Sequence, residues 1–227
     1  MLHELIEPTR HDLWQPVSAF SDQSGYQLFL TQREALLRVL NARKGRPQAY
    51  VQDRAKIAHL ALAVKPELVS SNDYEILEVG TGIGKAALTI QDTTHHHHHI
   101  TATNVLTDPT DAKAILNAGI DLYTGMPAEF LPSEWSNRFD VVMTSCVLGW
   151  TDTTVAIPHI LDVMKPKGIW VGLESGSAYC FDDPNTYLID RIHDIALQHN
   201  TTNCLSHEQR YAYNQQFNLF PFVFTKP

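Results

Sequence analysis

The stretch ILEVGTGIGKAAL, residues 76–88, combines an acidic residue with three glycines that alternate with other residues. Glu78 stands two positions before Gly80, and Gly82 and Gly84 follow. Glycine lets the backbone adopt positive φ and lets a ligand approach without a Cβ in the way. A turn of this kind, entered from an apolar strand and left through a helix, is where open parallel α/β sheets bind nucleotide-like ligands. The stretch therefore predicts a binding site, and Glu78 restricts the ligands that suit it.

Two phosphate-binding motifs do not match this spacing. A P-loop needs four residues between its first glycine and Gly-Lys, with Ser or Thr next, whereas three residues separate Gly80 from Gly84 and Ala86 follows Lys85. A dinucleotide fingerprint needs its third glycine at position 85, which is occupied by Lys85. Glu78 would also repel a pyrophosphate in a site of reduced dielectric. The sequence therefore argues against a nicotinamide dehydrogenase.

A ligand with an adenosine part, no phosphate and a cationic end meets no such repulsion. S-adenosylmethionine is that ligand, because its ammonium and sulfonium groups are attracted by a carboxylate such as Glu78. EVGTGIG resembles the first motif, acidic-x-Gly-x-Gly-x-Gly, of class I S-adenosylmethionine-dependent methyltransferases. FDVVMTSCVLGWTD is similar to that family's fourth strand and following loop, and HILDVMKPKGIWVG to its next helix, Lys-Pro turn and fifth strand. The matches span residues 75–174, and the tail FPFVFTKP resembles the family's last, antiparallel strand.

The resemblance implies a cofactor site built from several strand ends. Glu78 is expected to hold the methionine end, the first glycines to lie against the cofactor, and Gly84 to let the next helix pack closely. Asn104 stands where the family usually has an acid on the ribose hydroxyls, so we expect weaker cofactor affinity or a shifted strand end. Met126 replaces a common Asp in the adenine-contacting turn TGMPAEFLP, which leaves adenine to the backbone near Ala128 and to Glu129. The expected cofactor-binding residues are Glu78, Gly80, Thr81, Gly82, Gly84, Asn104, Val105, Ala128, Glu129, Ser145 and Cys146.

The loop SCVLGW is expected to line the methionine side of the cofactor and to face the methyl acceptor. Trp150 in this loop and Tyr50 are the candidates for the substrate pocket, with a purely structural role as the alternative for each. Cys146 is expected to be a packed residue and not a nucleophile, because methyl transfer from a sulfonium needs no covalent enzyme intermediate. We assign no catalytic base, although the sequence offers His159, His193, His199 and His207.

Short apolar runs alternate with helical stretches from residue 75 onward, in the order EILEV, ITATNVL, IDLY, FDVVMTS and GIWVGLE. Such runs suit strands buried on both faces of a parallel sheet. The expected fold is α/β: a doubly wound, mostly parallel seven-stranded sheet, the Rossmann-like methyltransferase fold. Helical patterns over 31–43 and 50–64 precede it. We expect residues 1–70 to form a helical extension or lid on the core and residues 71–227 to form the S-adenosylmethionine-binding domain, one structural unit overall.

Composition narrows the classes of partner. The chain has 227 residues, 44% of them hydrophobic, with a formal net charge of -8. An acidic balance argues against a nucleic-acid partner, and no apolar run has the length of a membrane span. Three scattered cysteines and an interrupted N-terminal apolar pattern favour a cytoplasmic protein. The tract His95 to His99 is expected to be a solvated loop and not a metal site, because consecutive residues point in different directions.

Three hypotheses of function remain. The first is a methyltransferase that acts on a small molecule by in-line displacement, with a protein acceptor left open. The second is a non-catalytic domain of the same fold, in which Asn104 and Met126 reflect loss of cofactor binding. The third is the nicotinamide dehydrogenase, against which Lys85 and Glu78 argue. The oligomeric state is open.

Overall fold

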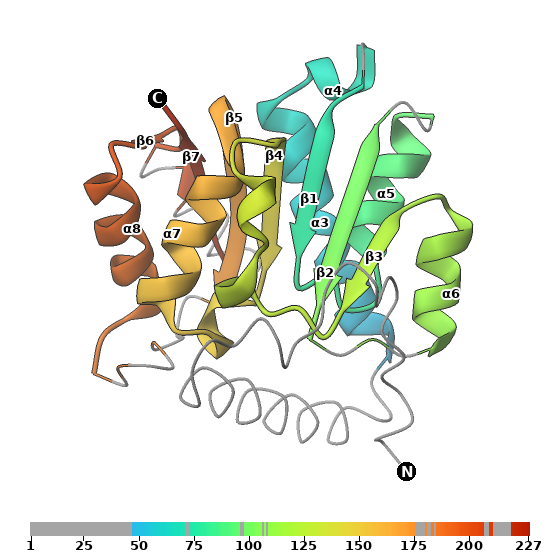
Figure 1. Cartoon of the computed structure of the whole chain (residues 1–227), viewed down its shortest axis with the longest axis horizontal. Helices are drawn as coiled ribbons and strands as arrows, with labels where there is room; N and C mark the ends of the chain where they lie inside the picture. Colours follow the sequence, from blue (N-terminus) through green and yellow to red (C-terminus); the bar gives the residue numbers. More distant parts are fainter. Residues whose placement is uncertain are drawn as a thin grey trace.

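The computed structural model describes residues 47–70, 73–95, 98–105, 107, 109–175, 180, 183, 185–206, 209–210 and 219–227, and side chains from residue 55 onward. Its centre is a seven-stranded sheet in the order β3-β2-β1-β4-β5-β7-β6 (Figure 1). The strands are β1 (Glu75–Val79), β2 (His99–Asn104), β3 (Asp121–Thr124), β4 (Phe139–Ser145), β5 (Met164–Ser175), β6 (Thr202–Asn203) and β7 (Leu219–Thr225).

The sheet is mixed. Strands β1 to β5 are parallel, whereas β7 is antiparallel to both β5 and β6. The expectation of a mostly parallel sheet is therefore confirmed for its larger part, and the tail FPFVFTKP supplies the antiparallel strand as expected. The strand order reverses at β1, which has β2 on one side and β4 on the other. Ligands of open α/β sheets bind at such a switch point, beyond the carboxyl ends of the strands.

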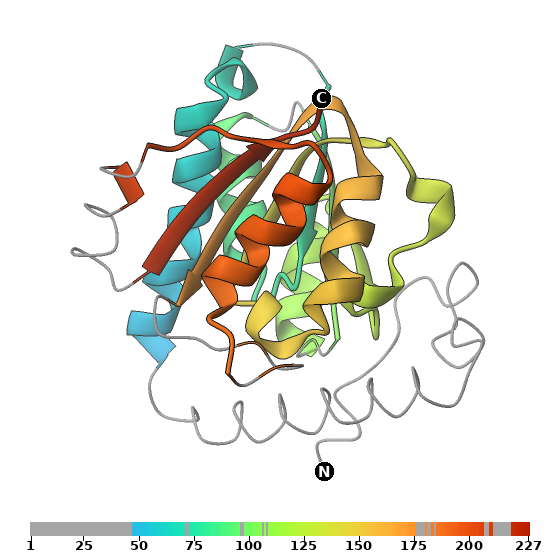
Figure 2. The ribbon, with the colours of Figure 1, turned by 90° about the vertical axis from the view of Figure 1, so that its left-hand side faces the viewer.

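Helices cover both faces of the sheet. One face carries α3 (Pro47–Val64), α5 (Lys85–Thr93) and α6 (Pro109–Asn117), and the other carries α7 (Thr153–Val163) and α8 (Leu188–Gln198). Figure 2 shows α3 on one side of the sheet and α8 and α7 on the other. Alternate residues of one strand serve the two faces, so that Ile76 packs with α3 and α5 while Leu77 and Val79 pack on the α7 side. The sheet is thus buried on both faces, as its non-alternating apolar strands predict.

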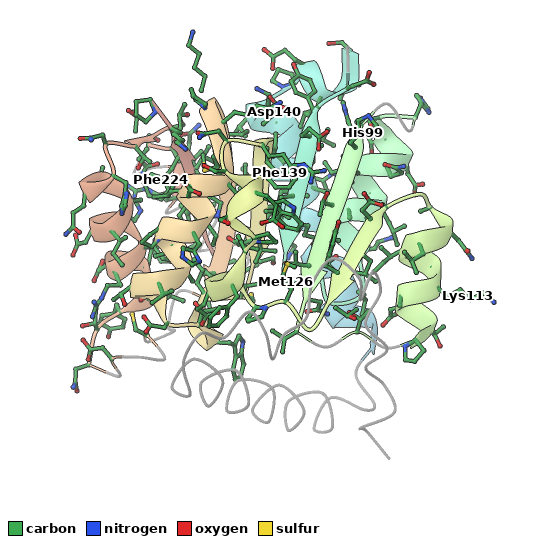
Figure 3. The ribbon with its side chains drawn as sticks, viewed as in Figure 1. His99, Lys113, Met126, Phe139, Asp140 and Phe224 are labelled. Atoms are coloured by element: carbon green, nitrogen blue, oxygen red, sulfur yellow. The ribbon has the colours of Figure 1, made fainter. Side chains whose placement is uncertain are left out.

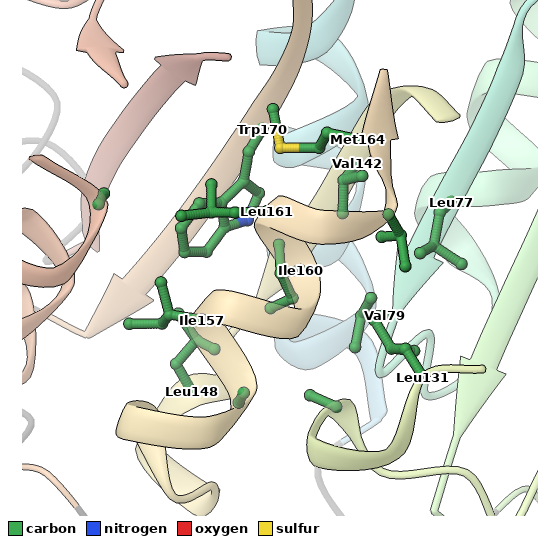
Figure 4. Close-up of a cluster of buried hydrophobic side chains, with 14 of the residues drawn as sticks. Leu77, Val79, Leu131, Val142, Leu148, Ile157, Ile160, Leu161, Met164 and Trp170 are labelled. Atoms are coloured by element: carbon green, nitrogen blue, oxygen red, sulfur yellow. The ribbon is translucent and has the colours of Figure 1, made fainter. Parts of the chain in front are cut away.

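Aromatic side chains fill the core between α7, α8 and the β5–β7 part of the sheet. Trp170, labelled in Figure 4 beside Leu161, is fully buried, and its indole Nε1 donates to Thr144 Oγ1 at 3.0 Å. Its ring lies edge-on to Phe222, with 4.9 Å between centroids. Gly172 makes room for that phenyl ring, because a Cβ at this position would lie 1.9 Å from Phe222 Cζ. Burying one such aromatic side chain contributes about 1.5–3 kcal/mol, so this glycine and aromatic pairing fixes β7 against β5.

The helix expected over 50–64 is confirmed as α3, while the one expected over 31–43 lies outside the described residues. Ile57, Ala58 and Ala61 are fully buried on the face of α3 that meets the sheet. Pro66 follows soon after the helix ends, as expected for a residue that cannot continue it. None of the described helices is long and apolar enough to cross a membrane.

The histidine tract takes part in the fold. His98 is only 7% exposed; its Nε2 lies 2.7 Å from the carbonyl oxygen of Leu68, and its Nδ1 accepts from the Tyr74 N–H at 3.3 Å. A neutral imidazole with its proton on Nε2 satisfies both bonds. The expectation of a solvated loop is therefore wrong for His98, which ties β2 to the segment before β1, although His95 is exposed. Among the described residues, no group of three His, Cys, Asp or Glu side chains could hold a metal ion.

Candidate functional site

The residues singled out from the sequence converge at one edge of the sheet. Val79, Asn104, Thr124 and Ser145 end the parallel strands β1, β2, β3 and β4, so the segments that follow them meet there. Figure 3 shows Met126, just past β3, at this edge, while His99 and Asp140 lie at the opposite one. We call this side of the sheet, where the parallel strands β1 to β4 end, the carboxyl edge. It is the candidate site, because open α/β sheets bind ligands beyond the carboxyl ends of their strands.

The glycine turn has left-handed backbone at all three glycines, with φ of 71°, 59° and 75° at Gly80, Gly82 and Gly84. Two of them are also required by packing within the chain. A Cβ on Gly80 would lie 2.3 Å from Val147 Cγ2, and one on Gly84 would lie 2.3 Å from Ile115 Cγ1. Gly84 thus allows close packing of Ile115 in α6, and its expected role toward the following helix, α5, stays a prediction.

Glu78 braces this turn from inside. Glu78 is 3% exposed, and its Oε2 accepts from Thr81 Oγ1 at 2.7 Å and from the Ala87 N–H at 3.0 Å. Gly84, the residue before α5, has no side chain with which to cap that helix. Glu78 instead satisfies one of the free N–H groups in the first turn of α5, and an acidic side chain is favourable at the positive end of the helix dipole. The turn is further tied to β2, because the Thr81 N–H donates to the Thr103 carbonyl at 2.9 Å. The expected role of Glu78 toward a cofactor stays a prediction, and the hydrogen bonds described above fix the position of its side chain within the turn.

Asn104 is the last residue of β2, so the strand end lies where the resemblance places it. Its Nδ2 donates to the Gly82 carbonyl at 3.4 Å and to Thr107 Oγ1 at 3.3 Å. The side chain is 9% exposed and faces the glycine turn. Val105, the next residue, is half-buried. Asn104 therefore connects the end of β2 to the second glycine of the turn, and its expected contact with a ribose stays a prediction.

The turn after β3 is packed tightly. Met126, in the place of the common Asp, is 1% exposed and its N–H donates to the Asn104 carbonyl at 3.1 Å. Ala128 and Glu129 begin the 3₁₀ turn η2 (Ala128–Phe130), and both are buried. Glu129 Oε1 accepts from the Asp152 N–H at 2.8 Å, which fixes the start of α7. The expected adenine contact of Glu129 stays a prediction, and its carboxylate has a bracing role that its position in the sequence did not indicate.

The loop after β4 begins with a strained residue. Ser145 is 7% exposed, and Cys146 has φ of 53°, a left-handed conformation that costs a non-glycine residue about 1–2 kcal/mol. The Cys146 N–H donates to the Leu173 carbonyl at 2.8 Å, which holds the turn. Trp150 ends the 3₁₀ turn η4 (Leu148–Trp150) and is half-buried. Tyr50 lies in the first turn of α3, and its side chain lies outside the described part of the chain.

Sequence reasoning missed Glu174, a third buried carboxylate near the same edge. It precedes the last residue of β5, is 2% exposed, and its Oε1 accepts from the N–H groups of Val147 at 3.0 Å and Leu148 at 3.1 Å. The signal was present in the sequence, because GIWVGLE carries an acid at the end of an apolar run, much as EILEV carries Glu78 one residue before its end. The sequence did not reveal which loop the carboxylate of Glu174 would contact.

Among the described residues, acidic side chains have different surroundings at the two edges of the sheet. Glu78, Glu129 and Glu174 are buried among the turns that follow the strands, and each accepts a hydrogen bond from a backbone N–H there. At the opposite edge Arg138 pairs with Glu75 at 3.3 Å and Lys165 with Asp140 at 2.7 Å. In the described part of the chain, the carboxyl edge thus holds buried acidic side chains and the opposite edge holds paired charges.

Of the histidines offered as candidate bases, His193 has structural neighbours that account for it, and His207 lies outside the described residues. His193, on α8, accepts at Nε2 from Arg210 at 3.0 Å and lies edge-on to the ring of Phe224. Burial, and next the Arg210 guanidinium, lowers the pKa of His193 below its usual value. The imidazole is therefore held neutral by structural neighbours, and no catalytic role is assigned to it.

Solved structures with this architecture identify the fold. Neither a protein-family model nor a curated protein matches the sequence. The 1,6-didemethyltoxoflavin-N1-methyltransferase of Burkholderia thailandensis, solved with 1,6-didemethyltoxoflavin and S-adenosylhomocysteine, has a TM-score of 0.57 at 15% identity, covering 97% of this chain and 94% of that one. The CurJ carbon methyltransferase has a TM-score of 0.58 at 16% identity, covering 76% of this chain and 53% of that one, so this chain spans about half its length.

The chain has the fold of the class I S-adenosylmethionine-dependent methyltransferases. The fold alone does not fix the reaction, because the cyclase SpnF shares it with a TM-score of 0.51 at 18% identity, covering 75% of this chain and 81% of that one. Function has to be argued from the site.

Proposed function

We propose that this protein is an S-adenosylmethionine-dependent methyltransferase that transfers a methyl group to a small-molecule acceptor. One observation carries the proposal: on this fold, the glycine turn at the switch point is backed by the buried carboxylate of Glu78, and the residues Gly84, Lys85 and Ala86 that follow do not have the P-loop pattern. A cationic adenosyl compound matches that charge, and a pyrophosphate does not.

The residues at the carboxyl edge fit such a cofactor. Asn104 would hold the ribose, with its amide as donor and acceptor, and Gly82 would let the cofactor lie against the backbone. Glu78 would attract the ammonium end, and Ser145 and Cys146 would border the methionine side. Val105, Ala128 and Glu129 would surround the adenine.

When bound, the cofactor supplies a methyl group on a positively charged sulfur, which an acceptor atom displaces in line. The chain contributes mainly by orientation, because holding two reactants in a near-attack geometry supplies about 7–11 kcal/mol. Bracing of the turns by three buried carboxylates serves this role, since it fixes the surfaces between which the reactants meet. Tyr50 and Trp150 would stand on the acceptor side of the pocket, while α3, which lies within the expected extension 1–70, packs on one face of the sheet.

A small acceptor is favoured over nucleic acid by the net charge of -8. The structure of the Burkholderia enzyme holds a small heterocycle, and a Haemonchus contortus N-methyltransferase with a TM-score of 0.51 at 14% identity, covering 74% of this chain and 52% of that one, is in complex with phosphomonomethylethanolamine. A protein acceptor or a non-catalytic binding role is the alternative.

The test is calorimetric titration of the full chain with S-adenosylmethionine, S-adenosylhomocysteine and NAD. We expect micromolar binding of the two adenosyl compounds and none of NAD. Glu78→Gln keeps the shape of the side chain but removes its charge, and should weaken both by about tenfold, equivalent to about 1.4 kcal/mol. Glu75→Gln, at the opposite edge, is the control and should bind as the wild type does.

Absence of binding to either adenosyl compound would refute the proposal and favour the non-catalytic alternative. Binding without S-adenosylhomocysteine release across a panel of small acceptors, but with release on peptides, would favour a protein acceptor.

A further inference from the structure

Glu174 is a buried carboxylate for which the proposed chemistry supplies no direct task. It is 2% exposed, in the strand β5 between Leu173 and Ser175. A carboxylate in such a place is costly unless it is well hydrogen-bonded. Its partners therefore show what the residue does.

The partners lie in the loop after β4. Oε1 of Glu174 accepts from two consecutive backbone N–H groups, those of Val147 and Leu148, at 3.0 and 3.1 Å. Consecutive N–H groups converge on one oxygen only where the chain turns sharply, and Cys146 makes that turn with its left-handed φ of 53°. Glu174 and the bond from the Cys146 N–H to the Leu173 carbonyl together hold the strained loop to β5.

The same loop rests on the glycine turn. The Val147 side chain packs so closely on Gly80 that a Cβ there would lie 2.3 Å from Val147 Cγ2 and 3.2 Å from Cγ1. The loop is thus fixed from two sides, by Glu174 through its backbone and by Gly80 through a side chain. The two segments expected to enclose the methionine end of a cofactor are therefore in direct contact.

We propose that Glu174 is a positioning residue that holds the loop Cys146–Trp150 against the glycine turn, and so shapes the pocket for the amino-acid end of the cofactor. This inference rests on the proposed function. It assigns Glu174 no contact with the cofactor, and its effect passes through Val147. Replacing Glu174 should therefore weaken binding of the amino-acid end of the cofactor and leave binding of its adenosine end unchanged.

The experiment compares two probes by calorimetry on the full chain. S-adenosylhomocysteine carries the amino-acid end, and 5′-methylthioadenosine lacks it. Glu174→Gln should weaken S-adenosylhomocysteine about 5- to 20-fold, because hydrogen bonds to a charged acceptor are about twice as strong as neutral ones, while 5′-methylthioadenosine changes less than twofold. Val147→Ala should act in the same direction, and the double variant should lose less than the product of the two single effects.

Controls separate positioning from loss of fold. Glu75→Gln is the matched change at the other edge and should alter neither affinity, whereas Asn104→Ala should weaken both probes. An equal loss for both probes in Glu174→Gln and Val147→Ala, or no loss for either, would overturn the inference while leaving the proposed function intact. A wild-type chain that binds neither probe would instead refute the proposed function.

Discussion

Gly84→Ala tests whether the glycine turn is built for packing against α6. Gly84 has φ of 75°, a left-handed conformation that costs an alanine about 1–2 kcal/mol. In addition, the new methyl group would lie 2.3 Å from Ile115 Cγ1 and 2.6 Å from Cδ1, and such overpacking of a buried site costs about 1–3 kcal/mol. The free energy of unfolding should therefore fall by about 2–4 kcal/mol once the lower entropy of the unfolded alanine chain is included.

Gly119→Ala is the matched control. Gly119 has φ of 78°, but its nearest neighbour would be Gln91 Nε2 at 3.9 Å, so only the backbone strain applies. We expect a loss of about 1 kcal/mol there. The assay is urea denaturation, with stability taken from the midpoint at constant m.

A double-mutant cycle with Ile115→Ala isolates the contact. Ile115→Ala alone should cost about 2–5 kcal/mol as a cavity in the core, yet it removes the atoms that collide with the new methyl of Gly84→Ala. The double variant should then be less destabilised than the sum of the single changes, by about 1–3 kcal/mol. Additive effects, or equal losses in Gly84→Ala and Gly119→Ala, would refute the packing explanation.

Three further changes test other parts of the fold. His98→Ala leaves the buried Leu68 carbonyl and the half-buried Tyr74 N–H without these bonds and should lower the free energy of unfolding by about 2–4 kcal/mol. The exposed His95→Ala should change it by less than about 0.5 kcal/mol, and equal effects would contradict the structural role of His98. Burial lowers the pKa of His193 below 6.5, so the contribution of this histidine to stability is present above pH 6.5 and is lost as the pH falls through the lower folded-state pKa. The denaturation midpoint of the wild type should therefore fall more steeply toward acid pH than that of His193→Gln. Parallel pH dependence of the two midpoints would contradict the lowered pKa. Gly172→Ala should be among the most destabilising small changes, since its methyl would enter the ring of Phe222, and Phe222→Leu in the same chain should recover part of the loss in thermal unfolding.

The local pattern of apolar residues was enough to predict the strands whose ends form the candidate site. The apolar runs EILEV and FDVVMTS coincide with β1 and β4, because a strand buried on both faces needs an unbroken apolar segment. The antiparallel tail strand and the glycine turn after β1 were also predicted, and Asn104 does end β2. These features depend on sequence separations of a few residues or on an ordered set of motifs.

Long-range contacts were not predictable in the same way. His98 is buried because Leu68, thirty residues earlier, offers it a carbonyl, and nothing within the tract distinguishes it from its neighbours. The packing of Val147 on Gly80 joins residues from different strand ends, and Glu174 meets its loop only because β4 and β5 are neighbours. Such contacts follow from the three-dimensional arrangement and not from local periodicity.

The most direct measurement of the central claim is a crystal structure of the full chain with S-adenosylhomocysteine. The account predicts the ligand across the carboxyl ends of β1 and β2, with its ribose at Asn104, its backbone contact at Gly82 and its amino-acid end between the glycine turn and the loop Cys146–Trp150. Density for the ligand elsewhere, or an empty carboxyl edge at saturating ligand, would contradict it.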